Sequence, residues 1–227
     1  MTHLDLFSGI GGFALAARWA GLETIQFVEI EKFAQQVLTK NFPGIPIHDN
    51  IKTFNATKFR GCGLVTGGYP CQPFSQAGKR RGEEDDRHLW PEMFRVIREA
   101  RPTWILCENV AGHITMGLDD VLFDLEDEGY ACQTFVIPAV AKDARHRRDR
   151  VWIVAHPNSK RGCLWETNRE DAEDVRESSR REEHRQWLPE PSVGRVVNGL
   201  PNRVDRLKGL GNEIVPQVAY EIMRCLK

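Results

Sequence analysis

The sequence lacks the features that would place it in a membrane, outside the cell or around a structural metal. In its 227 residues, no apolar run approaches the roughly 18 residues of a membrane helix. Residues 1–5 lack the basic and long apolar regions of a signal peptide. The six cysteines form no C-x-x-C pair or Cys/His cluster at zinc spacing. We therefore expect a cytoplasmic protein with reduced thiols, no metal site and no membrane partner.

The sequence also lacks an excess of charge of one sign, an internal repeat and a low-complexity tract. A formal net charge of −1 neither favours nor excludes nucleic acid, because a binding face can be locally basic. Residues 142–150 form such a locally basic segment. Charged residues at 28% and hydrophobic residues at 41% are ordinary for a globular protein. The length allows one sizeable α/β domain, or a domain plus a small appendage.

Short apolar runs alternate with helical patterns along the first 155 residues, which predicts an α/β fold. We expect strands at 4–7, 24–28, 45–47, 64–66, 104–107, 131–136 and 151–155. We expect helices at 15–20, 31–41, 89–100, 118–128 and 217–226. This alternation is typical of a Rossmann-like, doubly wound and mostly parallel sheet.

A glycine-rich turn at residues 8–14 joins the first predicted strand to the first predicted helix. This layout is typical of a nucleotide-binding unit, because glycines let the backbone approach a ligand and the N–H groups of the helix start point at it. Glu29 ends the second predicted strand about 20 residues later, where a carboxylate can accept hydrogen bonds from ribose hydroxyls. The alternative is that Glu29 is a solvated loop acid.

Cys71 follows the predicted strand at 64–66, after a glycine turn and Pro70. A cysteine in a loop at a strand end is a candidate nucleophile if its thiolate can form, whereas most free cysteines are buried core residues. The polar loop at 75–87 that follows is interpreted as a mobile lid, with a solvated charge run as the alternative. Asp49 and Glu108 also stand at strand ends, and such ends converge on one crevice in a doubly wound sheet.

Five motifs together resemble the DNA (cytosine-5) methyltransferase family. They occur in the family's order over nearly the whole chain: Asp5-Leu6-Phe7-Ser8-Gly9-Ile10-Gly11-Gly12, Pro70-Cys71-Gln72-Pro73-Phe74-Ser75, Glu108-Asn109-Val110, Arg148-x-Arg150 and Gly211-Asn212. The resemblance implies the class I methyltransferase fold and an enzyme that uses S-adenosyl-L-methionine, forms S-adenosyl-L-homocysteine and needs no metal. It also implies double-stranded DNA as the partner.

The resemblance also implies roles for individual residues. In the cofactor site, Glu29 would hold the ribose, Ile30 would pack on the adenine, Asp49 would face its amino group, and Asn212 would close a pocket lined by Phe7, Gly9 and Gly11. In catalysis, Cys71 would be the nucleophile and Glu108 would contact the base beside Arg148 and Arg150. The residues expected to contact DNA are Gln72, which would occupy the gap left by the target base, and Ser75 of the lid. Arg195 and Arg203 are candidate phosphate contacts, with solvated surface arginines as the alternative.

The implied chemistry explains why these residue types are needed. Addition of the Cys71 thiolate to C6 of cytosine makes C5 nucleophilic enough to attack the donor's methyl group. A carboxyl group at N3, supplied by Glu108, stabilises the charge that develops during this addition. Loss of the C5 proton and expulsion of Cys71 then restore the aromatic ring. The base must first be flipped out of the duplex to reach the pocket.

The chain departs from the family pattern at two places. His146 stands where the family usually has glutamine, although imidazole also forms hydrogen bonds. Residues 156–188 carry seven basic and eight acidic side chains and are too poor in apolar side chains to form a large recognition domain, as in compact phage or prophage members. We expect a catalytic domain at 1–155, a reduced target-recognition region at 156–195 and a returning segment at 196–227.

Three functions remain open on the sequence. The first is a monomeric DNA cytosine-5 methyltransferase in a bacterium or a phage-infected host cell, acting with a restriction endonuclease or an accessory recognition partner. The second is a tRNA cytosine-5 methyltransferase, although the Cys-Phe-Thr hallmark of that group is absent. The third is a catalytically inactive nucleic-acid-binding remnant.

Overall fold

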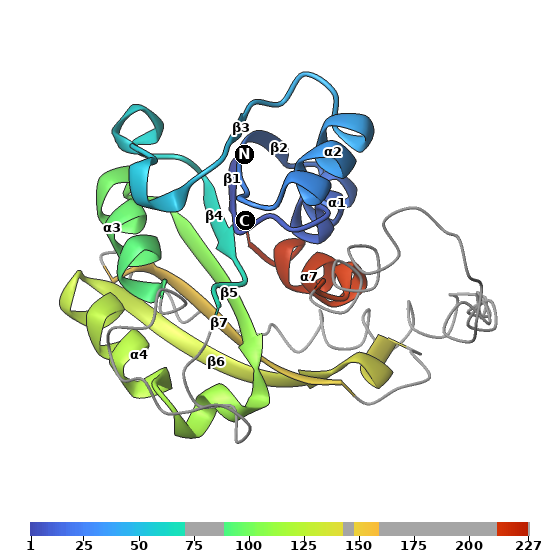
Figure 1. Ribbon diagram of the computed structural model, residues 1–227. Helices are drawn as coiled ribbons and strands as arrows, with labels where there is room; N and C mark the ends of the chain where they lie inside the picture. Colours follow the sequence, from blue (N-terminus) through green and yellow to red (C-terminus); the bar gives the residue numbers. More distant parts are fainter. Residues whose placement is uncertain (71–88, 143–147, 159–212, 227) are drawn as a thin grey trace, which may run out of the picture. The chain divides into compact units, whose positions relative to one another are not determined.

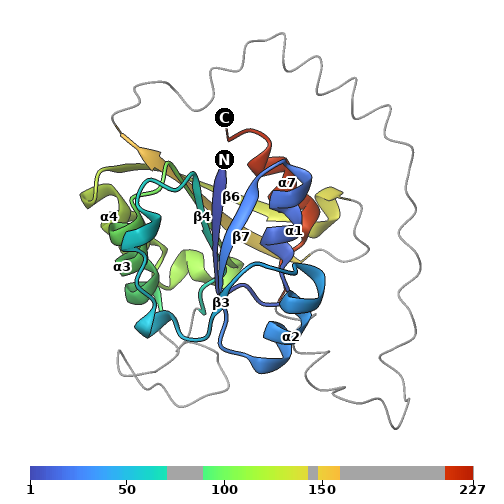
Figure 2. The ribbon, with the colours of Figure 1, turned by 90° about the horizontal axis from the view of Figure 1, so that it is seen from above.

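The computed structural model describes residues 1–70, 89–142, 148–158 and 213–226, which include one mixed sheet of seven strands with helices on both faces (Figure 1). The strands lie in the order β3-β2-β1-β4-β5-β7-β6. Their bounds are β1 Thr2–Leu6, β2 Glu23–Val28, β3 Ile47–His48, β4 Leu64–Gly67, β5 Trp104–Val110, β6 Tyr130–Pro138 and β7 Asp149–Pro157. Helices α1, α2 and α7 cover one face of the sheet, and α3 and α4 cover the other (Figures 1 and 2).

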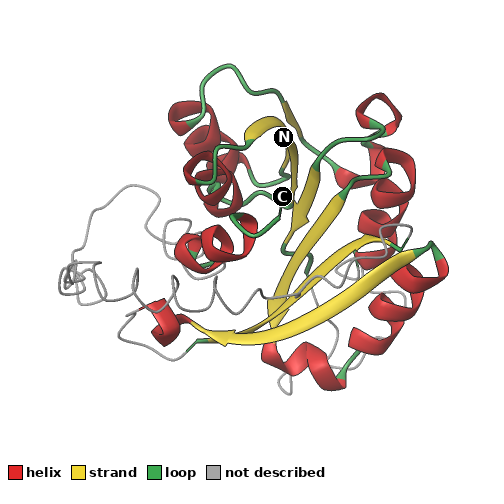
Figure 3. Ribbon diagram, turned by 180° about the vertical axis from the view of Figure 1, so that it is seen from behind, coloured by secondary structure: helices red, strands yellow, loops and turns green. Residues whose placement is uncertain are grey.

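The direction in which successive strands are added to the sheet reverses between β1 and β4. Strands β2 and β3 follow β1 toward one edge of the sheet, and β4 and β5 lie on the other side of β1. All of these neighbours pair in parallel. Strand β7 is inserted between β5 and β6 and is antiparallel to both (Figure 3). The reversal between β1 and β4 is the topological switch point, outside which ligands bind in open α/β sheets.

The helices begin and end where local sequence signals place them. Their bounds are α1 Gly12–Trp19, α2 Lys32–Asn41, α3 Trp90–Ala100, α4 Leu118–Asp127 and α7 Pro216–Met223. Helix α3 shows the pattern most clearly, because it buries Met93, Val96 and Ile97 on one face and has Pro91 in its first turn. Four short 3-10 helices complete the described chain: η1 Ile51–Thr53, η2 Thr57–Phe59, η3 Ala111–Thr115 and η4 Ala139–Lys142.

The central strands are buried on both faces, as expected for parallel strands between two helical layers. Leu4 and Leu6 of β1, Val65 of β4 and Ile105 of β5 are fully buried. None of the described helices is both long enough and apolar enough to cross a membrane.

The predicted fold class is confirmed, and the predicted strands and helices are found with end shifts of up to a few residues. The principal difference is at β5, which we expected to end before Glu108. Pairing with β7 extends β5 to Val110, and Glu108 lies within it opposite Trp152. The 3-10 helices were not predicted. Residues 1–157 and the C-terminal residues from 213 onward belong to one compact unit. The expected boundary at 195 lies outside the described residues.

Candidate active site

The glycine turn after β1 and the segment after β4 leave neighbouring strands at the switch point. Leu6 at the end of β1 pairs with Gly67 at the end of β4. The turn uses left-handed backbone at Phe7 (φ 52°), Gly9 (φ 53°) and Gly11 (φ 98°). Phe7 carries a side chain in this region, a conformation that costs of order 1–3 kcal/mol and clusters at functional sites. The backbone conformation of Phe7 therefore marks the turn as part of a candidate functional site.

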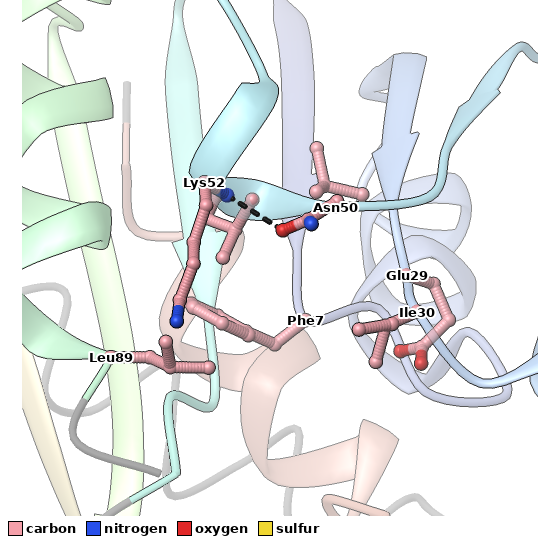
Figure 4. Close-up of a pocket in the computed structure, with 8 residues that line it drawn as sticks. Phe7, Glu29, Ile30, Asn50, Lys52 and Leu89 are labelled. Atoms are coloured by element: carbon pink, nitrogen blue, oxygen red, sulfur yellow. Dashed lines mark hydrogen bonds between the residues drawn. The ribbon is translucent and has the colours of Figure 1, made fainter. Parts of the chain in front are cut away.

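A cavity of about 310 Å³ lies beside this turn and has the chemistry of a nucleoside site. Its lining is Phe7, Val28, Glu29, Ile30, Asn50, Ile51, Lys52 and Leu89. In Figure 4 the Phe7 side chain extends toward Lys52 and Leu89, while Glu29 and Ile30 stand on the opposite side of the opening. An aromatic ring and aliphatic side chains suit a flat base, and a carboxylate suits ribose hydroxyls. The residues present therefore fit the adenosine part of S-adenosylmethionine.

The carboxyl group of Glu29 is held by two backbone N–H groups. Its Oε2 accepts a hydrogen bond from the Gly9 N–H at 2.7 Å, and its Oε1 accepts one from the Glu31 N–H at 2.7 Å. The side chain is buried, and burial raises the pKa of this carboxyl while the backbone hydrogen bonds oppose the rise. These contacts contradict the alternative of a solvated loop acid.

Asp49, predicted beside the adenine amino group, is not among the residues that line the cavity, and its role stays a prediction. Asp49 is exposed, and the neighbouring Asn50 lines the cavity instead. Asn50 is fixed there because its Oδ1 accepts the Lys52 N–H at 2.9 Å, which caps η1. Gly9 and Gly11 lie in the turn that borders the cavity, and the other predicted residues of the pocket, Phe7, Glu29 and Ile30, line it.

Three of the predicted catalytic residues come together at the edge of β5 and β7. Glu108 is buried, and its Oε1 lies 2.7 Å from Nε of Arg150 on β7. Burial raises the pKa of Glu108, and the positive charges of Arg150 and Arg148 act against this rise. Arg148 adopts left-handed backbone (φ 38°), and its Nη2 donates to the backbone oxygen of Glu213 at 2.6 Å. This cluster can hold a carboxyl group of raised proton affinity in a fixed orientation.

The segment that leads to Cys71 is anchored to the same strand. Nδ2 of Asn109 donates to the Tyr69 backbone oxygen at 3.1 Å, and the Tyr69 hydroxyl lies 2.7 Å from Nε2 of the buried His113. A Cβ atom at Gly68 would stand 3.4 Å from Oε2 of Glu108. The chain therefore leaves β4 directly beside Glu108. No role was predicted for Asn109 or Tyr69, although Asn109 belongs to the Glu108-Asn109-Val110 motif and Tyr69 directly precedes Pro70 of another motif.

Glu213 is a further residue of the site, and it was not predicted from the sequence. Its Oε2 accepts the Ile10 N–H and its Oε1 the Gly12 N–H, each at 2.9 Å. Burial raises the pKa of Glu213 to about 7. The signal available in the sequence was its position directly after the Gly211-Asn212 motif.

Several predicted residues lie outside the described part of the chain, and their roles remain predictions. They are Cys71, Gln72, Ser75 and the rest of the lid at 75–87, His146, Arg195, Arg203 and Asn212. In the described part of the chain, no group of three or more His, Cys, Asp or Glu side chains is arranged to hold a metal ion.

The strand order, the reversed β7 and the glycine turn at the switch point define a class I S-adenosylmethionine-dependent methyltransferase fold. Residues 1–198 match the family model described as C-5 cytosine-specific DNA methylase. The chain belongs to this family.

Named relatives agree with this assignment. Type II methyltransferase M.NgoMIV of Neisseria gonorrhoeae is 34% identical over 162 residues, covering 69% of this chain and 52% of that protein. Type II methyltransferase M.HhaI of Haemophilus parahaemolyticus is 32% identical over 163 residues, covering 70% and 50%. The chain thus spans about half the length of these relatives.

Solved structures show the same fold. A putative DNA modification methyltransferase encoded within an E. coli prophage has a TM-score of 0.60 and 27% identity, over 70% of this chain and 47% of that one. The Dnmt2 methyltransferase of S. pombe has a TM-score of 0.65 at 24% identity, over 83% of this chain and 58% of that one. The latter match concerns the fold alone.

Proposed function

We propose that the protein is a DNA cytosine-5 methyltransferase that uses S-adenosyl-L-methionine. The observation that carries the proposal is the buried Glu108, which is paired with Arg150 beside the turn leading to Cys71. The nucleoside-sized cavity lies on the other side of the switch point. Membership in the C-5 cytosine-specific family and the names of the Type II relatives support the same reaction.

In this mechanism the protein holds a proton where charge develops on the base. The raised pKa of Glu108 favours a protonated carboxyl group, which donates to N3 of a flipped-out cytosine. Arg150 keeps Glu108 in one orientation, and Arg148 adds positive charge beside it. The Cys71 thiolate attacks C6 and later leaves as the C5 proton is removed.

The cofactor would occupy the cavity and the turn. Phe7 and Ile30 would enclose its adenine, and Glu29 would accept hydrogen bonds from its ribose. We propose that Asp49 faces the adenine amino group and that Asn212 closes the pocket. S-adenosylmethionine supplies the methyl group when it is bound.

We propose double-stranded DNA as the substrate, with Gln72, Ser75, Arg195 and Arg203 as contacts. We also propose a reduced recognition region at 156–195 between a catalytic domain at 1–155 and a returning segment at 196–227. We further propose a cytoplasmic monomer that acts with a restriction endonuclease or an accessory recognition partner; the Type II names of the relatives support a restriction–modification system.

The test is transfer of labelled methyl groups from S-adenosylmethionine to mixed-sequence duplex DNA, with tRNA in parallel. We expect label at cytosine C5 of DNA. Cys71→Ser should abolish it, and Glu108→Gln should lower the rate about 10²- to 10⁴-fold, because it cannot supply a carboxylic acid proton. Matched controls are Cys225→Ser and Glu126→Gln, both at exposed positions, which should leave the rate unchanged.

Two outcomes would contradict the proposal. Label found only in tRNA would favour a tRNA cytosine-5 methyltransferase. Binding of duplex DNA that is equal in the wild type and Cys71→Ser, without transfer of label to either nucleic acid, would favour an inactive nucleic-acid-binding protein.

A further inference from the structure

The N–H groups of the glycine turn are occupied by carboxylates of the protein itself. Glu29 accepts the Gly9 N–H at 2.7 Å, while Glu213 accepts those of Ile10 and Gly12 at 2.9 Å each. Because Gly9 and Gly12 have no side chains, the carboxyl group of Glu213 can approach the backbone of the turn. A Cβ atom at Gly9 would stand 2.9 Å from Oε2 of Glu213, and one at Gly12 would overlap its Oε1. The turn therefore already holds an acidic side chain, which is an anion above a pH of about 7.

This anion sits where a helix start attracts negative charge. Helix α1 begins at Gly12, and its N-cap residue Gly11 offers no side-chain hydrogen bond. Unpaired N–H groups and the helix dipole make such an end an anion site. Glu213, about 200 residues further along the chain, supplies the missing negative charge from outside the helix.

A second anion at the turn would face strong repulsion. Glu213 is half-buried, and Asp5, Glu29 and Glu108 add carboxyl groups around it. The backbone of Glu213 is fixed separately, because its oxygen accepts Nη2 of Arg148 at 2.6 Å. The Glu213 side chain can therefore leave the turn while its backbone stays anchored.

The adenosine cavity borders the turn. Phe7 lines the cavity and directly precedes the turn, and Glu29 lines the cavity while holding Gly9. A cofactor with its adenosine in the cavity carries its amino-acid part to the turn or past it. That part ends in a carboxylate, which is the same kind of group that Glu213 presents.

We propose that Glu213 is an intramolecular competitor that holds the Ile10 and Gly12 N–H groups until the amino-acid carboxylate of the cofactor replaces it. The inference rests on the proposed use of S-adenosylmethionine. It assigns Glu213 as a residue that sets cofactor affinity through the amino-acid part alone. A permanent structural cap, by contrast, would leave these N–H groups unavailable to any ligand.

The test compares ligands with and without the amino-acid part. S-adenosylhomocysteine carries the carboxylate, whereas 5′-methylthioadenosine ends at the thioether. Affinities are measured by calorimetry for the full-length wild type, Glu213→Gln and Glu213→Ala. Glu221→Gln serves as the matched control, because Glu221 lies in the same segment and pairs with Lys142 rather than with the turn. Circular dichroism checks that each variant is folded, and the nearly isosteric Gln variant covers a failure of Ala to fold.

We expect Glu213→Gln and Glu213→Ala to bind S-adenosylhomocysteine about 3- to 30-fold more tightly than the wild type, with methylthioadenosine affinity and the control unchanged. Unchanged or weaker binding of S-adenosylhomocysteine by the folded Gln variant, with methylthioadenosine still bound, would overturn this inference alone. Failure of the wild type to bind either ligand would overturn the proposed cofactor and the inference with it.

Discussion

Carboxyl groups gather around the switch point, and burial raises the pKa of each of them. They are Asp5, Glu29, Glu108 and Glu213. Backbone N–H groups hold Glu29 and Glu213, an arginine holds Glu108, and the hydroxyl of Thr66 donates to Asp5 at 2.8 Å. At the scale of single residues, the protein thus keeps acids of increased proton affinity at the site where the proposed chemistry needs a proton donor.

The titration of Glu213 should make stability fall as pH rises. Its pKa is about 7 in the folded protein against an ordinary value of 4.5, so the folded state binds the proton more tightly than the unfolded state. The resulting stabilisation is complete below pH 4.5 and is lost as pH rises through about 7. Relative to Glu213→Gln, the wild type should lose up to about 3 kcal/mol in free energy of unfolding between these limits.

Urea denaturation of both proteins across this pH range measures the difference. The other three acids are present in both proteins, so the difference reports Glu213 together with its charge coupling to them. Glu126→Gln, at an exposed position, should follow the wild type at every pH. A difference between the wild type and Glu213→Gln that stays constant with pH would contradict the prediction.

At the scale of elements, the glycine turn and the segment before α7 fit each other closely. A Cβ atom at Gly12 would overlap Oε1 of Glu213 and approach Cγ1 of Ile214 to 2.8 Å. Gly12→Ala should therefore lower the free energy of unfolding by about 1–3 kcal/mol, as overpacking does in other cores. The double variant Gly12→Ala/Glu213→Ala should lose less than the sum of the single variants, since both changes act on one contact.

Chemical denaturation measures this coupling. Gly112→Ala is the matched control, because its added methyl group would meet only Cε of Met116 at 3.4 Å, and it should change stability by no more than about 0.5 kcal/mol. Equal effects of Gly12→Ala and Gly112→Ala would show that the turn tolerates a side chain.

At the scale of the whole molecule, the C-terminal helix completes the layer that the N-terminal helix begins (Figures 1 and 2). Helix α7 packs against α1. It buries Val218, Ala219 and Met223. The rings of Tyr220 and Trp19 meet edge to face at 6.2 Å between centroids. The cofactor side of the sheet therefore depends on residues from both ends of the described chain.

A charge placed on the buried face of α7 should destabilise the packing of this helix. Ala219 is fully buried, so Ala219→Asp should lower the free energy of unfolding by about 3 kcal/mol, because the new carboxylate has no partner there. Thermal unfolding measures the loss. Arg224→Ala, on the exposed part of the same segment, should stay within about 0.5 kcal/mol of the wild type. A wild-type melting temperature in Ala219→Asp would mean that α7 contributes little to stability.

The sequence by itself determined the alternating strands and helices, the glycine turn after β1 and the acids and arginines of the quoted motifs. Local periodicity and turn residues carry this information within a few neighbouring positions. Only the tertiary structure decided that β5 extends through Glu108, because the extension depends on pairing with β7 about 40 residues later. The contacts of Asn109 with Tyr69 and of Glu213 with the glycine turn join residues 40 and about 200 positions apart. No local pattern encodes such pairs, since they form only when the sheet brings its strand ends together.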